Sequence, residues 1–218
     1  MKKVDVDKIY KILKREFKKW KVPVIELIDI QTNDPFKVLL ATILSARTKD
    51  EVTMKAAQRL FKKISTPKEL SSLTQAQIEK LIYPVGFYKT KAKHLKLLPK
   101  ILKSEFNNIL PDEVEPLTKL PGVGRKTANL VVAAGFHKPA ICVDTHVHKI
   151  TNRLGYVNTK NPYETEMALR KKLPQKYWIE FNMFLVAFGQ HLCKPISPFC
   201  SKCPIKQHCN QINVKTSR

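Results

Sequence analysis

Apolar residues recur at helical spacing along nearly the whole chain, and this periodicity limits what the chain can fold into. Residues three and four positions apart share one face of a helix, so such spacing predicts amphipathic helices. The first expected helix carries on one face Ile9, Leu13, Phe17 and Trp20. Alternating patterns typical of strands are scarce, and the apolar run 140–143 is too short to form a sheet. We therefore expect an all-α fold of about ten helices with short connections.

Residues that favour helix ends mark several of the expected boundaries. Thr66 precedes a proline, a pair that suits an N-cap and the first turn of a helix. Thr74 and Gln77 have the spacing of a capping box, and Gly86 is expected to end the helix that begins there. The lysine-rich stretch 88–106 predicts one long amphipathic helix.

The chain carries 40 lysine and arginine residues against 18 aspartate and glutamate residues, a formal charge of +22. A compact protein with this charge repels itself, so we expect a polyanionic partner, with nucleic acid ahead of an acidic membrane surface. No stretch reaches the ~18 to 20 apolar residues that span a bilayer, and no signal peptide is evident. We expect a cytoplasmic protein without a membrane partner, in which clustered cysteines serve metal or redox chemistry before disulfides.

The segment L-P-G-V-G-R-K-T-A at 120–128 contains two closely spaced glycines, Gly122 and Gly124, which allow a tight backbone turn. A helix rich in small residues is expected to follow, and its N-terminal amides and dipole can hold a phosphate. With a short helix near 116–119 before it, the segment predicts a helix-hairpin-helix motif. An ordinary turn between two helices is the alternative, although Arg125 and Lys126 add positive charge for a nucleic acid.

Asp144 stands between an apolar run and the next helical pattern, in the sequence V-D-T-H-V-H. It is expected to be the N-cap of that helix, and a capping carboxylate is held firmly enough for electrostatic catalysis. His146 and His148 are only two positions apart, so they do not share a helix face as two metal ligands would. We expect these histidines to be surface or packing residues.

Four of the five cysteines follow the pattern C-x6-C-x2-C-x5-C, which indicates a metal site. The four candidate ligands are Cys193, Cys200, Cys203 and Cys209. Zinc sites of four cysteines usually have two tight C-x2-C pairs and this segment has one, so zinc and an iron–sulfur cluster are both open. Cys142 lies in an apolar run and is expected in the core.

These three constellations, in this order, resemble the endonuclease III branch of the helix-hairpin-helix DNA glycosylases. The resemblance extends from about residue 36 to residue 209. It implies a six-helix barrel at 28–138 that carries the hairpin, and a second domain built from 1–27 and 139–218. That second domain would hold a 4Fe–4S cluster on the four cysteines. The resemblance also implies that Lys126 is the nucleophile and Asp144 the catalytic carboxylate, in a cleft between the two parts.

Further site residues are expected to contact DNA. The hairpin contributes Gly122, Val123, Gly124 and Arg125. In the family that the chain resembles, a loop fills the space that the extruded base leaves. The matching loop here carries Arg47, at a position where many bacterial members have glutamine. Phe87 matches the position of a wedge that is often leucine, and its alternative role is a core aromatic beside Tyr88. A cluster that fixes the cysteine segment would present Lys194 to phosphates.

The activity that the resemblance implies is that of a bifunctional glycosylase and abasic-site lyase, acting in base excision repair on oxidised or ring-saturated pyrimidines. The expected partner is duplex DNA with a damaged base or an abasic site, and the expected state is a monomer. A second possibility is a monofunctional thymine/uracil or adenine mismatch glycosylase, although adenine-specific relatives normally lack a lysine at position 126. A non-catalytic helix-hairpin-helix module and a zinc-ribbon-like nucleic-acid binder are the remaining hypotheses.

Overall fold

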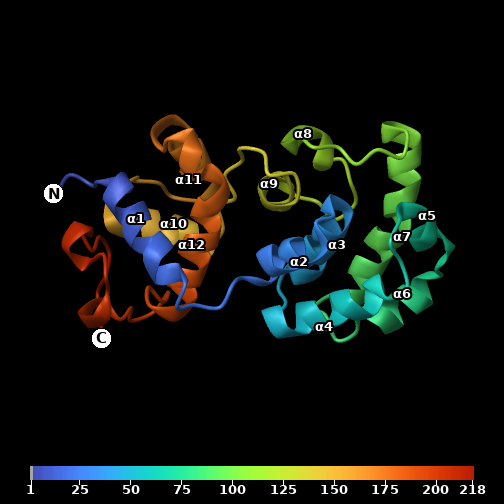
Figure 1. Cartoon of the computed structure of the whole chain (residues 1–218), viewed down its shortest axis with the longest axis horizontal. Coiled ribbons are helices and arrows are strands. Elements are labelled where there is room, and N and C mark those ends of the chain that lie inside the picture. The colour runs from blue at the N-terminus through green and yellow to red at the C-terminus, as the bar shows by residue number, and fades with distance from the viewer. Residues whose placement is uncertain (1) are drawn as a thin grey trace. The chain divides into compact units, whose positions relative to one another are not determined.

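The computed structural model describes residues 2–218, and it consists of helices and connecting segments without any strand in that range (Figure 1). The all-α prediction is therefore confirmed. The chain divides into two compact units, one formed by Val24–Lys138 and the other by Pro139–Arg218 together with the segment up to Pro23. The first of these units begins at Val24 rather than at residue 28, because the helix that starts there is continuous to Thr32.

The unit Val24–Lys138 is built around one buried helix. Its helices are α2 (Val24–Thr32), α3 (Pro35–Ser45), α4 (Asp50–Phe61), α5 (Pro67–Ser72), α6 (Gln75–Ile82), α7 (Tyr88–Phe106), α8 (Val114–Leu117) and α9 (Arg125–Leu130), followed by the π-helical segment η1 (Val131–Gly135). Helix α3 packs against α2, α4 and η1. Since its residues from Val38 to Leu44 are all buried, α3 is apolar on every side, as a central helix must be.

Short polar side chains fix the helix starts in this unit. The carboxylate of Asp34 accepts the amide of Phe36 at 2.9 Å and caps α3. Thr66 caps α5, and Thr74 with Gln77 forms the predicted capping box of α6. These ends were predictable from sequence because each cap contacts only residues two or three positions away.

Two sequence-based expectations about helix ends are wrong. Gly86 does not end α6, which stops at Ile82; instead Gly86 lies so close to the Arg47 loop that an added Cβ would be 2.5 Å from the Arg47 carbonyl oxygen. Trp20 lies outside α1, which ends at Phe17, and its ring stacks on His191 with centroids 6.0 Å apart. In both cases the local sequence pattern does not determine where the helix ends, and contacts with distant residues do.

The segment after α9 winds more widely than an α-helix. All five residues of η1 are buried, and a Cβ added to Gly135 would be 3.3 Å from the Cα of Pro35 and from the side chain of Val38. The backbone of Gly135 therefore packs directly against α3. The small residues of this stretch, noted in the sequence, allow this close approach.

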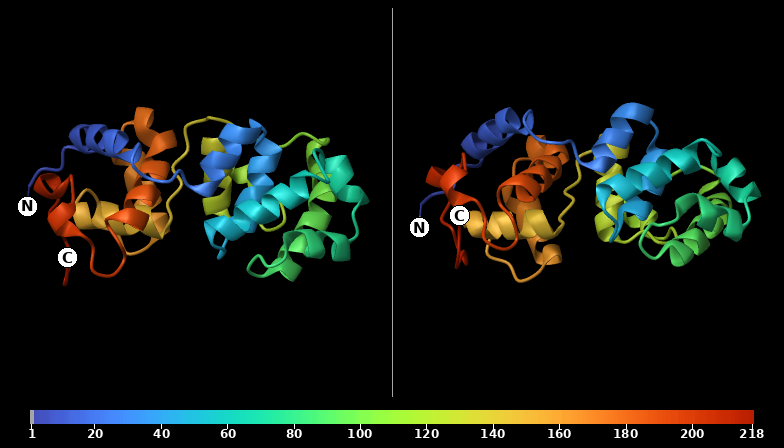
Figure 2. Two further views of the ribbon diagram at one scale, coloured as in Figure 1. Left: turned by 60° about the horizontal axis from the view of Figure 1, so that its bottom comes forward. Right: turned by 90° about the horizontal axis from the view of Figure 1, so that it is seen from below.

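The other unit joins the N-terminal segment to the C-terminal third of the chain (Figure 2). Its elements are α1 (Val6–Phe17), α10 (Thr145–Leu154), α11 (Pro162–Lys172), η2 (Gln175–Tyr177), α12 (Trp178–His191), η3 (Cys200–Lys202) and η4 (Lys206–His208). Ile9 and Leu13 of α1 are buried in one apolar cluster with Phe188 of α12. Lys2 and Asn210 exchange two hydrogen bonds, of 2.8 and 3.1 Å, which tie the first residues of the chain to the segment after the cysteines.

Among residues 2–218, none of the helices combines the length and the apolar character required to cross a lipid bilayer.

Candidate functional site

Helices α8 and α9 and the turn between them form the predicted helix-hairpin-helix segment. Gly122 adopts a φ of +78°, and a Cβ there would lie 2.7 Å from Nδ1 of His94 on α7. Glycine is thus required twice, by the backbone conformation and by the contact with His94. Val123 is buried, and its amide donates to the carbonyl of Leu120 at 3.1 Å, so this residue holds the turn together.

The second glycine of the hairpin has a different environment. Gly124 is the N-cap of α9 and has an extended backbone that any residue can adopt. A Cβ added to Gly124 would meet no atom within 4 Å, and no side chain caps the helix at this end. The protein itself therefore does not require glycine here, and the space beside the first turn of α9 is open.

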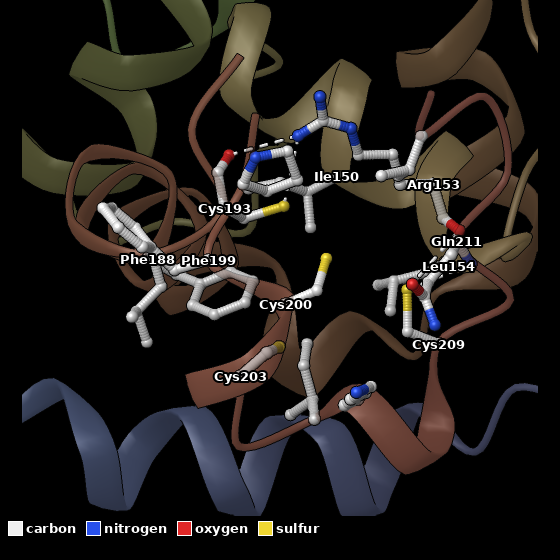
Figure 3. A pocket seen from close by; sticks show the side chains of 15 residues that line it. Ile150, Arg153, Leu154, Phe188, Cys193, Phe199, Cys200, Cys203, Cys209 and Gln211 are labelled. Carbon is white, nitrogen blue, oxygen red and sulfur yellow. Dashed lines mark hydrogen bonds between the residues drawn. The ribbon is translucent and has the colours of Figure 1, made fainter. Parts of the chain in front are cut away.

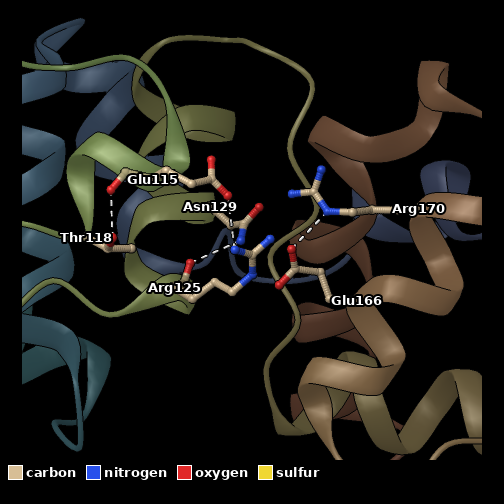
Figure 4. Close-up of polar contacts among 6 residues, drawn as sticks. All are labelled: Glu115, Thr118, Arg125, Asn129, Glu166 and Arg170. Carbon is tan, nitrogen blue, oxygen red and sulfur yellow. Dashed lines mark hydrogen bonds and ion pairs between the residues drawn. The ribbon is translucent and has the colours of Figure 1, made fainter.

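Two basic residues occupy the first turn of α9. Arg125 pairs with Glu115 at 3.2 Å, and the side chain of Asn129 donates to the Arg125 carbonyl at 3.1 Å (Figure 4). The pair with Glu115 links the start of α9 to α8, where Thr118 donates to the Glu115 carbonyl. The side chain of Lys126, the next residue, is exposed.

Asp144 is the N-cap of α10, which belongs to the other unit. Its carboxylate accepts the amide of Val147 at 2.8 Å, which confirms the predicted N-cap, and its side chain is only half-buried. His146 lies against the backbone of Gly189, and Nδ1 of His148 is 2.7 Å from the hydroxyl of Thr165. Burial lowers the pKa of His148, in keeping with the packing role expected for it. Figure 4 also shows the pair Glu166–Arg170 on α11 of this unit.

The four clustered cysteines line one pocket (Figure 3). None of them is in a disulfide, and the space between the lining atoms, including the part open to solvent, is about 430 Å³. Most of the other lining residues are apolar, among them Ile150, Leu154, Phe188 and Phe199, and Arg153, Lys206 and Gln211 also line the pocket. Within residues 2–218, no three His, Cys, Asp or Glu side chains are grouped as ligands of one metal ion would be. Cys142 lies apart, buried in the core as expected.

Hydrogen-bond donors accompany two of these sulfur atoms. Nη1 of Arg153 is 3.4 Å from Sγ of Cys193, and the amide of Gln211 is 3.3 Å from Sγ of Cys209. Burial raises the pKa of the Cys203 thiol to about 12 and also raises the pKa of Cys193 and Cys209. Burial thus favours the protonated form of these three thiols, and a positively charged centre would have to take the place of their protons.

Arg153 also fixes the segment between the first two cysteines. Its guanidinium donates to the carbonyls of Lys194 at 2.8 Å and Pro195 at 2.7 Å. The side chain of Lys194 is exposed, with its ammonium 5.9 Å from the centre of the Phe199 ring. The segment thus displays Lys194 on a backbone that Arg153 holds in place.

Arg47 and Phe87 lie together in the unit Val24–Lys138. The Phe87 side chain is 62% exposed, so the alternative of a core aromatic is wrong. Its backbone has a φ of 57° at the N-cap of α7, which turns the ring outward, while the neighbouring Tyr88 packs edge-on against Tyr83. The guanidinium carbon of Arg47, which also has a positive φ of 54°, is 5.5 Å from the Phe87 ring centre.

Lys91 is a buried lysine that no motif in the sequence singled out. It is only 6% exposed, and its ammonium donates to the carbonyls of Leu44 at 2.8 Å and Ala46 at 2.6 Å. Burial lowers the pKa of Lys91 to about 8. The available signal was its position, because Lys91 falls on the apolar face of α7 that continues through Leu95 and Leu98.

Comparison with known proteins identifies the family. The profile of the HhH-GPD superfamily base excision DNA repair protein matches residues 40–175. Endonuclease III of Thermotoga maritima is 49% identical over 176 residues, which cover 81% of this chain and 83% of that protein. The chain spans about half the length of some plant relatives, including 47% of the chloroplastic endonuclease III homolog 2 of Arabidopsis thaliana, to which it is 42% identical.

Solved structures agree with this assignment. A non-covalent endonuclease III–DNA complex has a TM-score of 0.82 at 34% identity, covering 96% of this chain and 97% of that one. A trapped covalent endonuclease III–DNA intermediate has a TM-score of 0.79 at 33% identity, with the same coverage. The chain therefore belongs to the HhH-GPD superfamily of base excision DNA repair proteins and, within it, to the endonuclease III family.

Proposed function

We propose that this chain removes damaged pyrimidines from duplex DNA and cleaves the resulting abasic strand, with Lys126 as the nucleophile. As a member of the endonuclease III family, the chain is a DNA glycosylase and abasic-site lyase of base excision repair. The observation that carries the assignment of Lys126 is its place, because it is an exposed lysine in the first turn of a helix whose N-terminus is open.

The hairpin supplies the DNA contact in this proposal. Gly124 has room for a side chain and an ordinary backbone, so the open space beside it is available to an approaching DNA backbone. The first turn of α9 then directs its amides and the positive end of its dipole at a phosphate. Gly122 and the buried Val123 fix the shape of the turn, and Arg125 adds charge. The formal charge of +22 favours the same polyanionic partner.

In this proposal, base removal and strand cleavage both start from the amine of Lys126 beside an extruded nucleotide. A base inside a duplex cannot be reached, so the nucleotide has to be flipped out of the stack. The unprotonated amine of Lys126 attacks C1′, the bond between C1′ and the base breaks, and the base leaves with a proton. Ring opening gives an imine between Lys126 and C1′. Loss of a proton from C2′ then expels the 3′ phosphate, and water hydrolyses the imine to release the enzyme.

Asp144 acts electrostatically in this proposal. Its carboxylate is held by the amide of Val147 at the start of α10 and keeps an exposed side. A fixed negative charge stabilises the positive charge that grows on the sugar as the base departs. Lys126 and Asp144 belong to different units of the chain.

Arg47 and Phe87 are proposed to fill the space that the extruded nucleotide leaves in the duplex. An exposed aromatic ring inserted between bases offsets part of the stacking lost on extrusion. The adjacent guanidinium of Arg47 offers several hydrogen-bond donors to the base left without its partner.

The cysteine pocket is proposed to hold a 4Fe–4S cluster, with Cys193, Cys200, Cys203 and Cys209 as the four ligands. Four thiols around one shared, mostly apolar space, with N–H donors directed at two of the sulfurs, are suited to such a cluster. The cluster would connect the cysteine segment to α10 and α12, and so keep Lys194 in place for a phosphate. With all four thiolates used, it has no open position for substrate.

The purified protein is expected to be yellow-brown and to contain about four irons per chain. Cys203→Ser should lower the iron content and the unfolding temperature of the unit that contains the pocket, because one ligand is lost. Cys142→Ala is the matched control, since this cysteine is buried outside the pocket and its loss should leave the iron content unchanged. Metal analysis of both variants checks this, and colourless wild-type protein with one zinc per chain would contradict the cluster.

The proposed activity is tested with a duplex that contains one abasic site, incubated with the protein and sodium borohydride. Reduction of the imine should leave a stable protein–DNA adduct that is visible by denaturing electrophoresis. A monofunctional glycosylase would release a base from damaged DNA without forming this adduct. A protein that only shifts the duplex in a native gel would be a binding module, and the proposed function would fail.

A further inference from the structure

Two exposed loops of the unit Val24–Lys138 meet at a small buried network. We define the Arg47 loop as residues 45–49 and the Phe87 turn as residues 85–87. Lys91, on the first turns of α7, lies beneath both. Its ammonium contacts three oxygens, the carbonyls of Leu44 and Ala46 and, at 3.3 Å, the hydroxyl of Thr48. An ammonium has three N–H donors, so all three have a partner.

The position of the ammonium also suits the end of α3. This helix stops at Ser45, and the Leu44 and Ala46 carbonyls lie at its C-terminus, where the helix dipole is negative. Lys91 thus supplies a positive charge to carbonyls that the helix itself leaves without a partner. Because these carbonyls lie where α3 passes into the Arg47 loop, Lys91 holds the backbone at the point where that loop leaves the helix.

Thr48 links the same network to the Phe87 turn. Its hydroxyl donates to the Ala46 carbonyl at 3.3 Å and accepts the amide of Gly86 at 3.2 Å as well as Lys91. This uses the one donor and both acceptor positions of a hydroxyl. The backbones of the two loops are in direct contact, since a Cβ on Gly86 would be 2.5 Å from the Arg47 carbonyl oxygen. Neither loop can shift by itself without breaking these bonds.

The residues at the tips of the two loops have backbones that need such support. Arg47 and Phe87 both have φ near +55°, a region that L-residues with side chains rarely adopt. Their side chains nevertheless lie together on the surface, with the guanidinium 5.5 Å from the ring. A conformation of this kind persists only when the surrounding contacts determine it.

We propose that Lys91 is a positioning residue that fixes the Arg47 loop and the Phe87 turn as one preassembled element, which enters the duplex during extrusion of the damaged nucleotide. This inference rests on the proposed function and adds to it the residue on which the extrusion step depends. Fixing both loops before DNA binds removes the entropy cost of ordering them in the complex. Lys91 itself does not contact the reacting atoms in this role.

The test compares Lys91→Met with Lys96→Met. Lys96 lies on the same helix, and its ammonium donates to the carbonyls of Ser71 at 2.8 Å and Leu73 at 2.7 Å at the end of α5, so it is matched in chemistry. Single-turnover excision of 5,6-dihydrouracil from a fully paired duplex should fall about 100-fold in Lys91→Met, as for other misplaced site elements. Lys96→Met should stay close to wild type.

Two further measurements separate positioning from a general structural defect. When the 5,6-dihydrouracil lies in an unpaired bubble, its extrusion costs less because no base pair has to be broken, so Lys91→Met should lose much less activity. In a chain that already carries Arg47→Ala and Phe87→Ala, adding Lys91→Met should cause little further loss, because the element it fixes is absent. An equal loss on paired and bubble DNA, or a full additional loss in the triple variant, would overturn the proposal.

Thr48→Val provides a second variant if Lys91→Met does not fold, because it keeps the side-chain shape and removes the link to Gly86. It should show the same preference for bubble DNA, and a wild-type preference would again reject the proposal. The outcome is distinct from failure of the proposed function. Loss of the borohydride adduct in the wild type would reject the enzyme activity, whereas equal behaviour of Lys91→Met and Lys96→Met would reject only the role of Lys91.

Discussion

Lys126→Ala should reduce the borohydride-trapped adduct on abasic DNA at least about 1000-fold, to the background level of the assay. The methyl group that replaces the side chain has no amine to attack C1′, and no imine can be reduced. DNA binding should survive, because the variant loses one of 40 basic residues and keeps the backbone of the hairpin. Denaturing electrophoresis of the adduct and a native binding assay on the same duplex measure the two effects separately.

Lys119→Ala is the control for this experiment. Lys119 is an exposed lysine just before the hairpin glycines, so its loss changes the local charge equally while leaving the proposed nucleophile intact. It should form the adduct at close to the wild-type yield. If Lys126→Ala were trapped as efficiently as Lys119→Ala, another amine would be the nucleophile.

Asp144→Asn should slow base excision about 100- to 1000-fold without changing the unfolding temperature. Asparagine caps helices about as well as aspartate, so the bond to the Val147 amide and the start of α10 should be preserved. Only the negative charge proposed to stabilise the sugar is removed. Single-turnover release of 5,6-dihydrouracil, with thermal unfolding of the same samples, gives both quantities.

Two comparisons make the Asp144 result specific. Asp34→Asn changes another capping aspartate, which bonds the Phe36 amide at the start of α3, and it should leave excision unchanged. Asp144→Ala removes the charge and the cap together, so it should lose activity and also about 1 kcal/mol of stability. Normal excision by Asp144→Asn would reduce this residue to a helix cap.

Local signals in the sequence predicted much of the fold. Thr66 and Thr74 begin helices as expected, and Asp144 caps α10, because a cap depends on residues two or three positions away. The long helix 88–106 agrees with α7 because its amphipathic periodicity is also a local signal. Motifs of short range also marked Lys126, Asp144 and the four cysteines as candidate site residues, and their roles stay predictions.

What the sequence did not predict depends on distant partners. The wide turn of η1 accommodates the approach of Gly135 to α3, and Gly86 is required by the Arg47 carbonyl, neither of which a local pattern contains. Lys91 shows the same limit in the site. Its place on the apolar face of α7 is a local signal, but the carbonyls of Leu44 and Ala46 that bind its ammonium come from α3 and the loop after it, which no local pattern contains.

The division of the chain into one continuous and one discontinuous unit has a consequence for biosynthesis. Residues 24–138 leave the ribosome as an uninterrupted segment, so this unit has all of its helices available to fold first. Helix α1 is made earlier still, but its apolar residues Ile9 and Leu13 pack with Phe188 of α12 and have to wait for it. The four cysteines of the pocket all follow α12 in the chain and are synthesised after it. Iron for the proposed cluster can therefore be inserted only after the hairpin-bearing unit has been synthesised, which makes cofactor loading a late event in the maturation of this protein.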